Sequence, residues 1–265
     1  MDLGRLVLSK LILVSDPKDW LITNQLIFPT HTILKESCLY SLENSFEVKI
    51  MVSTGVSVVT TTWNERENLA ELIPAIRNML QQVPHEIIVV DDNSPDGTIE
   101  VANRLADVVV SKKREGQSKG LLCGMKLAKF PVIITIDADL ENNPKHIPKL
   151  IQQIAKFGIV VASRTKLPRI SEIIASKTLG KLLGVTDTLS NFKAFRKETV
   201  SEFKLRVGET FGAEFLVIAK KKGLSIGEIK YDPPPRRKNP RIGGTIKANL
   251  RIIWASIKAL VLYIF

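Results

Sequence analysis

From about residue 51 onward, the chain alternates between two hydrophobic periods, one typical of strands and one typical of helices. Short runs rich in β-branched residues predict strands over residues 56–61, 86–91, 108–111, 132–137 and 159–163. Between them, apolar residues spaced three or four apart predict helices over residues 69–82, 98–105, 118–129 and 145–157. Strands that are apolar throughout and separated by helices indicate a mainly parallel sheet with helices on both faces. The expected fold class is therefore α/β.

Outside this region the pattern is weaker. Helices are predicted around residues 170–183 and 209–222, and a last strand over residues 224–231, which ends before the proline block 233–235. Residues 1–50 show neither period, so they are either an accessory segment packed on the domain or a poorly ordered extension before a native start near Met51; we favour the second. The expected organisation is an N-terminal extension (1–50), an α/β domain (51–242) and a C-terminal helical segment (243–265).

Polar residues gather where three of the predicted strands end. They occupy residues 62–68, 91–97 and 137–143, each directly after a strand. In open parallel sheets, ligands bind beyond the carboxyl ends of the strands. These three segments are therefore the expected site.

The third segment carries three acids at alternate positions, Asp137, Asp139 and Glu141. In an extended chain such residues point to one face, and carboxylate oxygens are the ligands preferred by Mg²⁺ and Mn²⁺. The alternative is that they are solvated loop acids, some capping the helix that starts near residue 144. The apolar strand before them and the expected sheet edge favour a metal site.

The other two segments offer contacts for a nucleotide. Trp63 and Glu65 provide stacking and hydrogen bonding for a base, and Asp92 provides an acceptor for a base or ribose. For residues 94–98 ordinary turn chemistry is the better interpretation, and for Asp92 the two interpretations stay open.

Taken in order, five short motifs resemble the inverting glycosyltransferases of family 2, which have a GT-A (Rossmann-like) fold, and among them the dolichyl-phosphate mannose synthases. That group carries Pro-x-Tyr-Asn-Glu, Asp-Asp-x-Ser-x-Asp-Gly-Thr, Asp-Ala-Asp-Leu-Gln, Ser-Arg and Ser-Gly-Phe. The corresponding segments here are residues 61–65, 91–98, 137–141, 163–164 and 190–192, and the resemblance spans about residues 54–242. This chain departs from the pattern at four positions. They are Thr61 for Pro, Trp63 for Tyr, Glu141 for Gln and Asn191 for Gly.

The resemblance implies a metal-dependent, inverting transfer of a sugar from a nucleotide diphosphate sugar to a polyprenyl (dolichyl) phosphate, with mannose from GDP-mannose favoured and glucose from UDP-glucose next. It implies Asp139 and Arg164 as catalytic residues. The implied nucleotide-binding residues are Thr61, Trp63, Glu65, Val90, Asp92, Asp137 and Ala138. The implied ligands of Mg²⁺ or Mn²⁺ are Asp137, Asp139 and Glu141. The implied acceptor-phosphate residues are Arg164, Ser190, Arg236, Arg237 and Arg241. The alternatives are transfer to a glycan or protein hydroxyl, or a nucleotide-sugar-binding protein without turnover.

The formal net charge of +11 is concentrated near the C-terminal end. No acidic residue follows Asp232, whereas seven basic residues do. These are Arg236, Arg237, Lys238, Arg241, Lys247, Arg251 and Lys258. An anionic partner is expected there. Nucleic acid is not expected, because the basic residues of the 236–241 segment follow the proline block 233–235 and have no aromatic residues interleaved to stack on bases.

The last 21 residues, 245–265, form a cationic stripe and a wide apolar face when placed on a helix. This pattern suits a helix lying in the membrane interface beside anionic headgroups; the alternative is a helix packed on the domain with its charges outward. No apolar run reaches the length of about 20 residues that spans a bilayer. Two distant cysteines and the lack of a recognisable export signal indicate a reducing compartment. The expected location is peripheral, on the cytoplasmic face of a membrane.

Overall fold

The computed structural model describes residues 55–201, 203–205, 211–234 and 245–264. The predicted N-terminal extension therefore lies outside the described residues. The predicted α/β class is confirmed: one seven-stranded sheet has the strand order β3-β2-β1-β4-β6-β5-β7. The strands are β1 Val56–Thr62, β2 His85–Asp91, β3 Val108–Ser111, β4 Val132–Thr135, β5 Ile159–Arg164, β6 Lys193–Arg196 and β7 Ile226–Tyr231.

Strand β6 is the element that the sequence did not predict. It runs antiparallel to both β4 and β5, whereas the other pairs of the sheet are parallel. Its four residues begin with Lys193 and end with Arg196, so it has no apolar run to reveal it. Strand β4 is shorter than predicted and ends at Thr135, which leaves Asp137 in the loop beyond the strand. Together these features bring the loop before β6 next to the end of β4.

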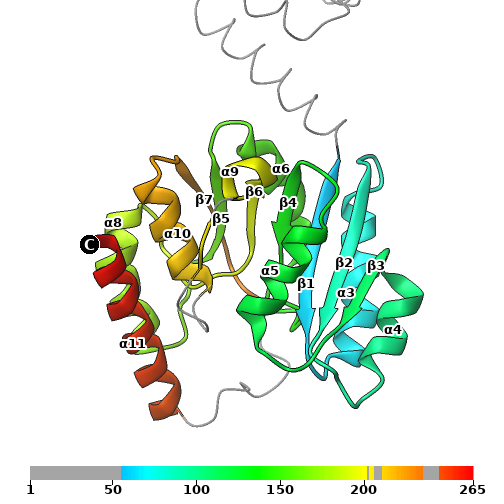
Figure 1. Cartoon of the computed structure of the whole chain (residues 1–265). Helices are drawn as coiled ribbons and strands as arrows, with labels where there is room; N and C mark the ends of the chain where they lie inside the picture. Colours follow the sequence, from blue (N-terminus) through cyan, green and yellow to red (C-terminus); the bar gives the residue numbers. More distant parts are fainter. Residues whose placement is uncertain (1–54, 202, 206–210, 235–244, 265) are drawn as a thin grey trace, which may run out of the picture. The chain divides into compact units, whose positions relative to one another are not determined.

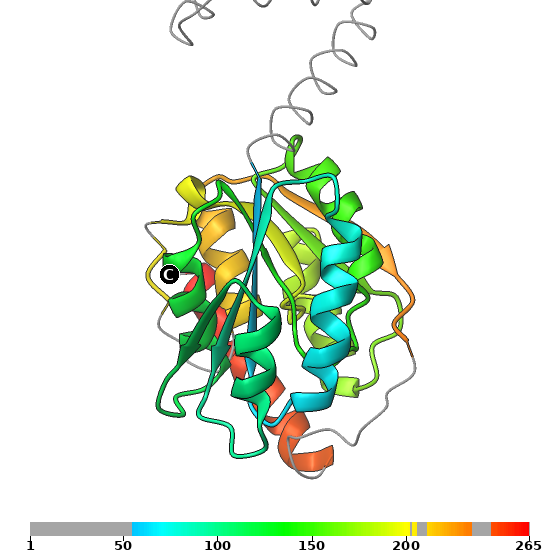
Figure 2. The same ribbon diagram turned by 90° about the vertical axis from the view of Figure 1, so that its right-hand side faces the viewer.

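Helices cover both faces of the sheet (Figures 1 and 2). The helices are α3 Arg66–Met79, α4 Thr98–Leu105, α5 Gln117–Leu127, α6 Ile147–Ile154, α7 Ile170–Ala175, α8 Lys181–Leu183, α9 Lys197–Val200, α10 Phe211–Lys221 and α11 Thr245–Ile264. A 3₁₀ turn, η2 Pro144–His146, precedes α6, and a π-helical segment, η3 Ser176–Gly180, joins α7 to α8. The predicted helix over residues 170–183 is thus a helical run with a π segment in its middle.

Two apolar cores result from the alternation of side chains along the strands. Val58 and Ile87 face a core that contains residues of α3, α4 and α6. Their neighbours Val59 and Ile88 face a second core, built from α5, α8, α10 and α11. Both faces of the sheet are therefore buried, and only the loops at the strand ends are free to form a site.

Candidate active site

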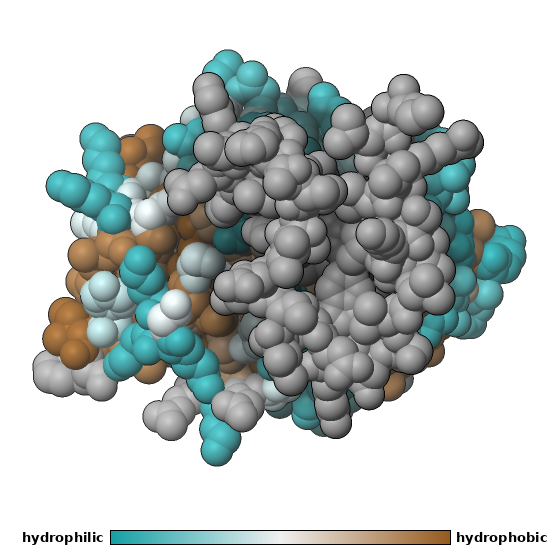
Figure 3. Space-filling model, turned by 90° about the horizontal axis from the view of Figure 1, so that it is seen from above, coloured by the Kyte–Doolittle hydropathy of each residue, from teal (hydrophilic) through white to brown (hydrophobic). Residues whose placement is uncertain are grey.

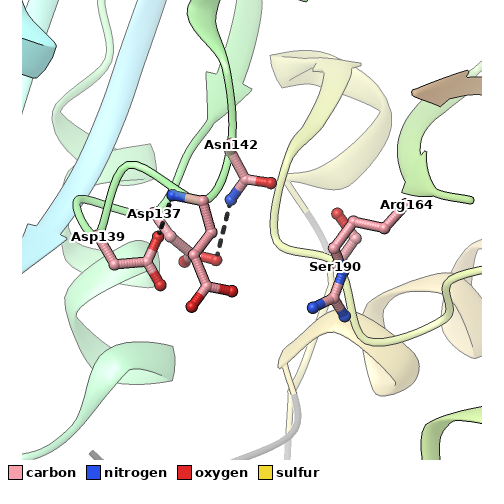
Figure 4. A pocket seen from close by; sticks show the side chains of 6 residues that line it. Asp137, Asp139, Asn142, Arg164 and Ser190 are labelled. Atoms are coloured by element: carbon pink, nitrogen blue, oxygen red, sulfur yellow. Dashed lines mark hydrogen bonds between the residues drawn. The ribbon is translucent and has the colours of Figure 1, made fainter. Parts of the chain in front are cut away.

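A small pocket, open to solvent, lies at the carboxyl ends of β4 and β5. Its lining residues are Asp137, Asp139, Glu141, Asn142, Arg164 and Ser190. Figure 4 shows the carboxylates of Asp137 and Asp139 on one side and Ser190 with the Arg164 guanidinium on the other. The pocket thus places acids opposite a cation across a small open space.

The acids stand on a tight turn between β4 and η2. Leu140, between Asp139 and Glu141, has a φ of 61°, a left-handed conformation that non-glycine residues adopt at a cost. The backbone N–H of Glu141 donates to Asp139 Oδ1 at 3.0 Å. Asn143 then caps η2 by accepting from the backbone of Lys145 at 3.0 Å. The strained turn keeps the three acids on the pocket side instead of continuing the strand.

Asp137 accepts three side-chain hydrogen bonds within the described part of the chain. Its Oδ1 accepts from Gln117 Nε2 at 2.5 Å and from Asn191 Nδ2 at 3.3 Å, and its Oδ2 accepts from Asn142 Nδ2 at 3.4 Å. Burial raises the pKa of Asp137, although the hydrogen bond from Asn191 and the positive charges of Lys193 and Arg164 act in the opposite direction. The ionised form of the Asp137 carboxylate is therefore stabilised by the nearby positive charges of Lys193 and Arg164.

The cation side is built around Arg164, the last residue of β5. Its Nε donates to Asp187 Oδ2 at 2.6 Å, and its Nη2 lies 3.7 Å from Glu172 Oε2. Arg169 also pairs with Glu172, at 3.0 Å. Burial alone lowers the pKa of Arg164, but the adjacent carboxylates of Asp187 and Glu172 outweigh it and raise that pKa. Arg164 is thus a fixed positive charge whose direction is set by its ion pairs.

A second cation, Lys193, lies beneath the site at the start of β6. Its side chain is fully buried, and within the described residues its Nζ has no hydrogen-bond partner. Burial lowers the pKa of Lys193 to about 8, although the charges of Asp187 and Asp137 oppose this. A buried ammonium without hydrogen bonds is costly, which makes Lys193 a candidate functional residue.

The segment after β2 is held in place by its own turn. Asp91 accepts from the Thr62 hydroxyl at 2.7 Å and from the backbone and hydroxyl of Ser94. Asp92 pairs with Lys112 at 2.5 Å and accepts from the backbone N–H of Gly116 at 3.0 Å. Both oxygens of Asp92 are therefore engaged by the segment that leads into α5.

Other predicted nucleotide-binding residues lie near this segment but outside the pocket. The guanidinium of Arg114 stacks on Trp63, 3.4 Å from the ring centroid. Glu65 is buried, accepting from Asn68 Nδ2 at 2.6 Å. Val90 is part of the core against α5. Thr61 Cγ2 packs so closely on Gly120 that a Cβ there would lie 2.7 Å away.

Of the seven residues predicted to bind the nucleotide, only Asp137 lines the pocket. Ala138, the next residue, is buried in the core. The predicted nucleotide role of the other residues stays a prediction.

The acids at the pocket fit a hard divalent cation in their chemistry, because all of them offer oxygen ligands. Within the described residues, however, no three acidic, His or Cys side chains are gathered closely enough to hold a metal ion. Magnesium sites use one or two protein carboxylates and take further ligands from substrate phosphates. The donor set therefore suits Mg²⁺ or Mn²⁺ bound together with a diphosphate, with one or two of the carboxylates Asp137, Asp139 and Glu141 as the protein ligands.

Only two of the five residues predicted to bind the acceptor phosphate, Arg164 and Ser190, lie among the residues that the structure describes. Arg164 and Ser190 line the same pocket, as expected for neighbouring roles. The Ser190 hydroxyl donates to the Ala162 carbonyl at 2.7 Å and accepts from the backbone of Phe192, so it also holds the loop before β6. Arg236, Arg237 and Arg241 lie outside the described residues.

Several residues of the site had not been identified from the sequence. They are Gln117, Asp187 and Lys193. Asp187 stands in a mostly polar stretch, residues 186–190, between a helix and the unpredicted β6, and that stretch was the available signal. Gln117 carries no pattern of its own and comes to Asp137 only through the fold, whereas Asn142 lies in the predicted segment 137–143.

Comparison with known proteins agrees with this geometry. The model of glycosyl transferase family 2 matches residues 57–199. A dolichol-phosphate mannosyltransferase of Pyrococcus furiosus is 34% identical over 224 residues, which are 77% of this chain and 64% of that protein. An undecaprenyl-phosphate 4-deoxy-4-formamido-L-arabinose transferase of Pectobacterium carotovorum is 32% identical over 55% of this chain and 50% of that protein. The chain thus spans between half and two thirds of the length of these relatives.

Solved structures share the fold. Glucosyl-3-phosphoglycerate synthase from Mycobacterium tuberculosis, in complex with Mn²⁺, uridine diphosphate and glucosyl-3-phosphoglycerate, superposes with a TM-score of 0.68 at 19% identity, covering 89% of this chain and 85% of that one. Mannosyl-3-phosphoglycerate synthase from Rubrobacter xylanophilus has a TM-score of 0.65 at 16% identity, covering 83% and 76%. Because the family model covers more than half of the chain and the expected GT-A fold is found, this chain belongs to glycosyl transferase family 2.

Proposed function

We propose that this protein is a metal-dependent, inverting glycosyltransferase that moves a sugar from a nucleotide diphosphate sugar to a polyprenyl phosphate. Mannose from GDP-mannose is the favoured sugar, and glucose from UDP-glucose is next. The observation that carries the proposal is the pocket in which Asp137, Asp139 and Glu141 face an ion-paired arginine. The two relatives above, named as transferases that act with dolichol phosphate and undecaprenyl phosphate, support the same substrate class.

The acids would hold the donor's diphosphate through Mg²⁺ or Mn²⁺. When bound, the cation offsets the negative charge that develops on the departing nucleoside diphosphate. The left-handed turn at Leu140 fixes Asp139 and Glu141 on the pocket side before the donor arrives. The hydrogen bonds to Asp137 fix its carboxylate in the same way. Preorganisation of this kind lowers the cost of assembling the charged site.

Arg164 would hold the acceptor phosphate. Its Nε is taken by Asp187, and within the described residues its Nη1 donates no hydrogen bond, which leaves that edge of the guanidinium for a phosphate. A phosphate acceptor is already ionised at neutral pH and needs no general base to attack the anomeric carbon.

The helix α11 suggests how a lipid acceptor reaches the pocket. It packs on the domain through Ala255 and Ala259, whereas a stripe of large apolar side chains is exposed. The stripe, which we call the α11 apolar stripe, consists of Ile246, Leu250, Ile253, Trp254, Ile257, Val261 and Ile264. These residues fall within about 100° of arc at helical spacing. The expected apolar face is therefore mostly turned away from the core.

Helix α7 extends the same surface. Ser171 donates from its hydroxyl and its backbone to Asn249 Oδ1 of α11, at 2.6 and 3.2 Å, so the two helices are held together. Ile170 on α7 is 74% exposed, and Ile173 and Ile174 are also exposed. Figure 3 shows apolar surface gathered on the side of the molecule where α8 and α11 lie in Figure 1. We infer that this face rests on an anionic membrane, because the exposed cations Arg251 and Lys258 border the stripe.

Glu172 connects this surface to the pocket. It lies on α7 next to Ser171 and pairs with Arg164, which lines the pocket. A membrane-bound α7 would place the acceptor's phosphate near Arg164 while its lipid chain stays in the bilayer. Among the described helices, none is both long and apolar enough to cross a membrane. From the α11 apolar stripe and the cations beside it, we propose a peripheral location on the cytoplasmic face of a membrane.

Transfer of label from nucleotide sugars tests the function. Purified protein is incubated with labelled GDP-mannose or UDP-glucose, Mg²⁺ or Mn²⁺, and either polyprenyl phosphate or hydroxyl acceptors. Label in the organic phase supports the proposal, label on a hydroxyl acceptor favours transfer to a glycan or protein, and binding without transfer favours a protein that has lost turnover. Asp139→Ala is expected to abolish transfer with an unchanged circular dichroism spectrum, and an active variant would refute the assigned role of Asp139.

Flotation with liposomes tests the membrane surface separately. The full chain is expected to float with anionic vesicles and not with neutral ones. Replacing Ile257 and Val261 of the α11 apolar stripe by Ser is expected to reduce flotation strongly, because both side chains are exposed and their loss leaves the packed face of α11 intact. Equal flotation of the variant and the wild-type chain would contradict the membrane role of α11.

A further inference from the structure

Asn191 lies beside the pocket, in the loop that leads into β6. It follows Ser190, which lines the pocket, and precedes β6 by two residues. Its carbonyl accepts from the Thr135 hydroxyl at 2.5 Å, which ties it to the end of β4. The family resemblance places a glycine here, so the side chain of Asn191 is an addition peculiar to this chain's version of the motif.

That side chain reaches across to the donor side of the pocket. Asn191 Nδ2 donates to Gln117 Oε1 at 3.0 Å and to Asp137 Oδ1 at 3.3 Å, while Gln117 Nε2 donates to the same Oδ1 at 2.5 Å. We call Asn191 and Gln117 the amide clamp. Gln117 is the first residue of α5 and follows Gly116, which is hydrogen-bonded to Asp92. The amide clamp therefore joins the end of β2, the acidic turn and the loop before β6.

The clamp leaves hydrogen-bonding capacity unused. A carboxylate oxygen has two lone pairs, and Asp137 Oδ1 already accepts two N–H groups. An amide offers one carbonyl oxygen and two N–H donors. Within the described residues, Asn191 Oδ1 accepts no hydrogen bond, and one N–H of Gln117 is also unused. An acceptor on Asn191 and a donor on Gln117 are the kinds of group that two neighbouring hydroxyl groups of a sugar require.

The position of the clamp matches where the transferred sugar must lie. In the proposed reaction the sugar sits between the diphosphate at the acidic turn and the acceptor phosphate at Arg164. Asn191 contacts Asp137 on the first side and is bonded through the chain to Ser190 on the second. The clamp therefore lies between the part of the site proposed for the diphosphate and the part proposed for the acceptor phosphate.

We propose that Asn191, together with Gln117, determines which sugar is transferred by hydrogen-bonding the hydroxyl groups of the donor sugar. This inference rests on the proposed glycosyl transfer and deepens it. The matching epimer satisfies the free amide groups, whereas the wrong epimer leaves them unpaired in a partly closed site. One hydrogen bond of this kind is worth about 1 kcal/mol, or about fivefold in a rate or binding constant. A glycine at residue 191 removes that discrimination.

The test compares donors that differ at one hydroxyl group. For wild-type protein, Asn191→Gly and Gln117→Ala, the kcat/KM and Kd values are measured for GDP-mannose against GDP-glucose and for UDP-glucose against UDP-galactose. Gln117 is exposed, so its replacement keeps the inference testable even where Asn191→Gly folds poorly. The matched control is Asn78→Ala, which breaks another amide pair, with Gln81 at 2.7 Å, on the exposed surface of α3.

Both clamp variants are expected to lower the preference between epimers by about fivefold or more, with the Kd of the sugar-free nucleoside diphosphate unchanged. The control is expected to keep the wild-type preference. An unchanged preference in both clamp variants overturns the inference, and so does an equal loss of affinity for both epimers and for the nucleoside diphosphate, since that shows a role in positioning Asp137 only. A wild-type protein without transfer contradicts the proposed function, while the Kd ratios still decide the role of the clamp.

Discussion

Replacing the buried Lys193 by Met should stabilise the protein at neutral pH. The side chain is fully buried, and within the described residues its ammonium group makes no hydrogen bond. Its pKa falls from 10.5 to about 8, a difference of about 2.5, and each pH unit corresponds to about 1.4 kcal/mol. Keeping Lys193 charged in the fold at pH 7 therefore costs about 3 kcal/mol. Met fills a similar volume without that cost.

The pH dependence of the free energy of unfolding tests whether the buried charge of Lys193 causes the expected gain in stability. Below pH 8 both the folded and the unfolded chain hold the proton on Lys193, so its contribution is constant. Between pH 8 and 10.5 the unfolded chain keeps the proton and the folded chain releases it, so rising pH stabilises the fold. The advantage of Lys193→Met over wild type is expected to shrink by about 2 to 3 kcal/mol between pH 7 and pH 10.

Urea unfolding at both pH values measures this difference. The control is Lys126→Met on the exposed surface of α5, which should change the free energy of unfolding by less than about 0.5 kcal/mol at either pH. If Lys193→Met is less stable than wild type at pH 7, the attraction of Asp137 and Asp187 outweighs burial, and the reasoning is refuted. Catalysis is expected to fall in the same variant, because Asp137 loses a nearby positive charge that favours its ionised form.

Three further changes follow from contacts in the site and its support. Arg164→Ala leaves the buried carboxylate of Asp187 without its partner at 2.6 Å, so urea unfolding should show a loss of about 3 kcal/mol; a loss below about 1 kcal/mol would show that the pair is well solvated. Gly212→Ala would place a methyl group 2.7 Å from a backbone oxygen, and thermal unfolding should show a loss of about 2 kcal/mol, whereas an unchanged Tm would mean that α10 shifts freely. Arg114→Ala uncovers the ring of Trp63, and acrylamide quenching of fluorescence should rise; equal quenching would contradict the stacking.

The sequence predicted the sheet well where strands were apolar and pairing was parallel. The first five predicted strands and the helices between them were found within a few residues of the expected bounds. Strand β6 was missed because Lys193 and Arg196 at its ends leave no apolar run in its four residues. Tertiary packing overrode the local pattern at that strand.

The site was predicted in outline and not in its contacts. Asp137, Asp139, Glu141, Arg164 and Ser190 do line one pocket, because the ends of neighbouring strands meet at one edge of the sheet. Some of the residues that orient them come from segments distant in the sequence. Local periodicity does not predict a contact such as that of Asn191 with Asp137, which are 54 residues apart. The predicted roles of Trp63 and Asp92 stay predictions, since both side chains contact residues of the segment before α5.

The central claim is that the acids of the pocket hold a nucleotide diphosphate through a divalent cation. Calorimetric titration of GDP and UDP into the full chain, with Mg²⁺ or with a chelator, measures this directly, and Asp139→Asn keeps the side chain's size while removing its charge. We expect binding by the wild-type chain only with the cation, and a loss of at least tenfold in affinity, about 1.4 kcal/mol, in the variant. Binding that is equally tight with the chelator, or in Asp139→Asn, would contradict the account.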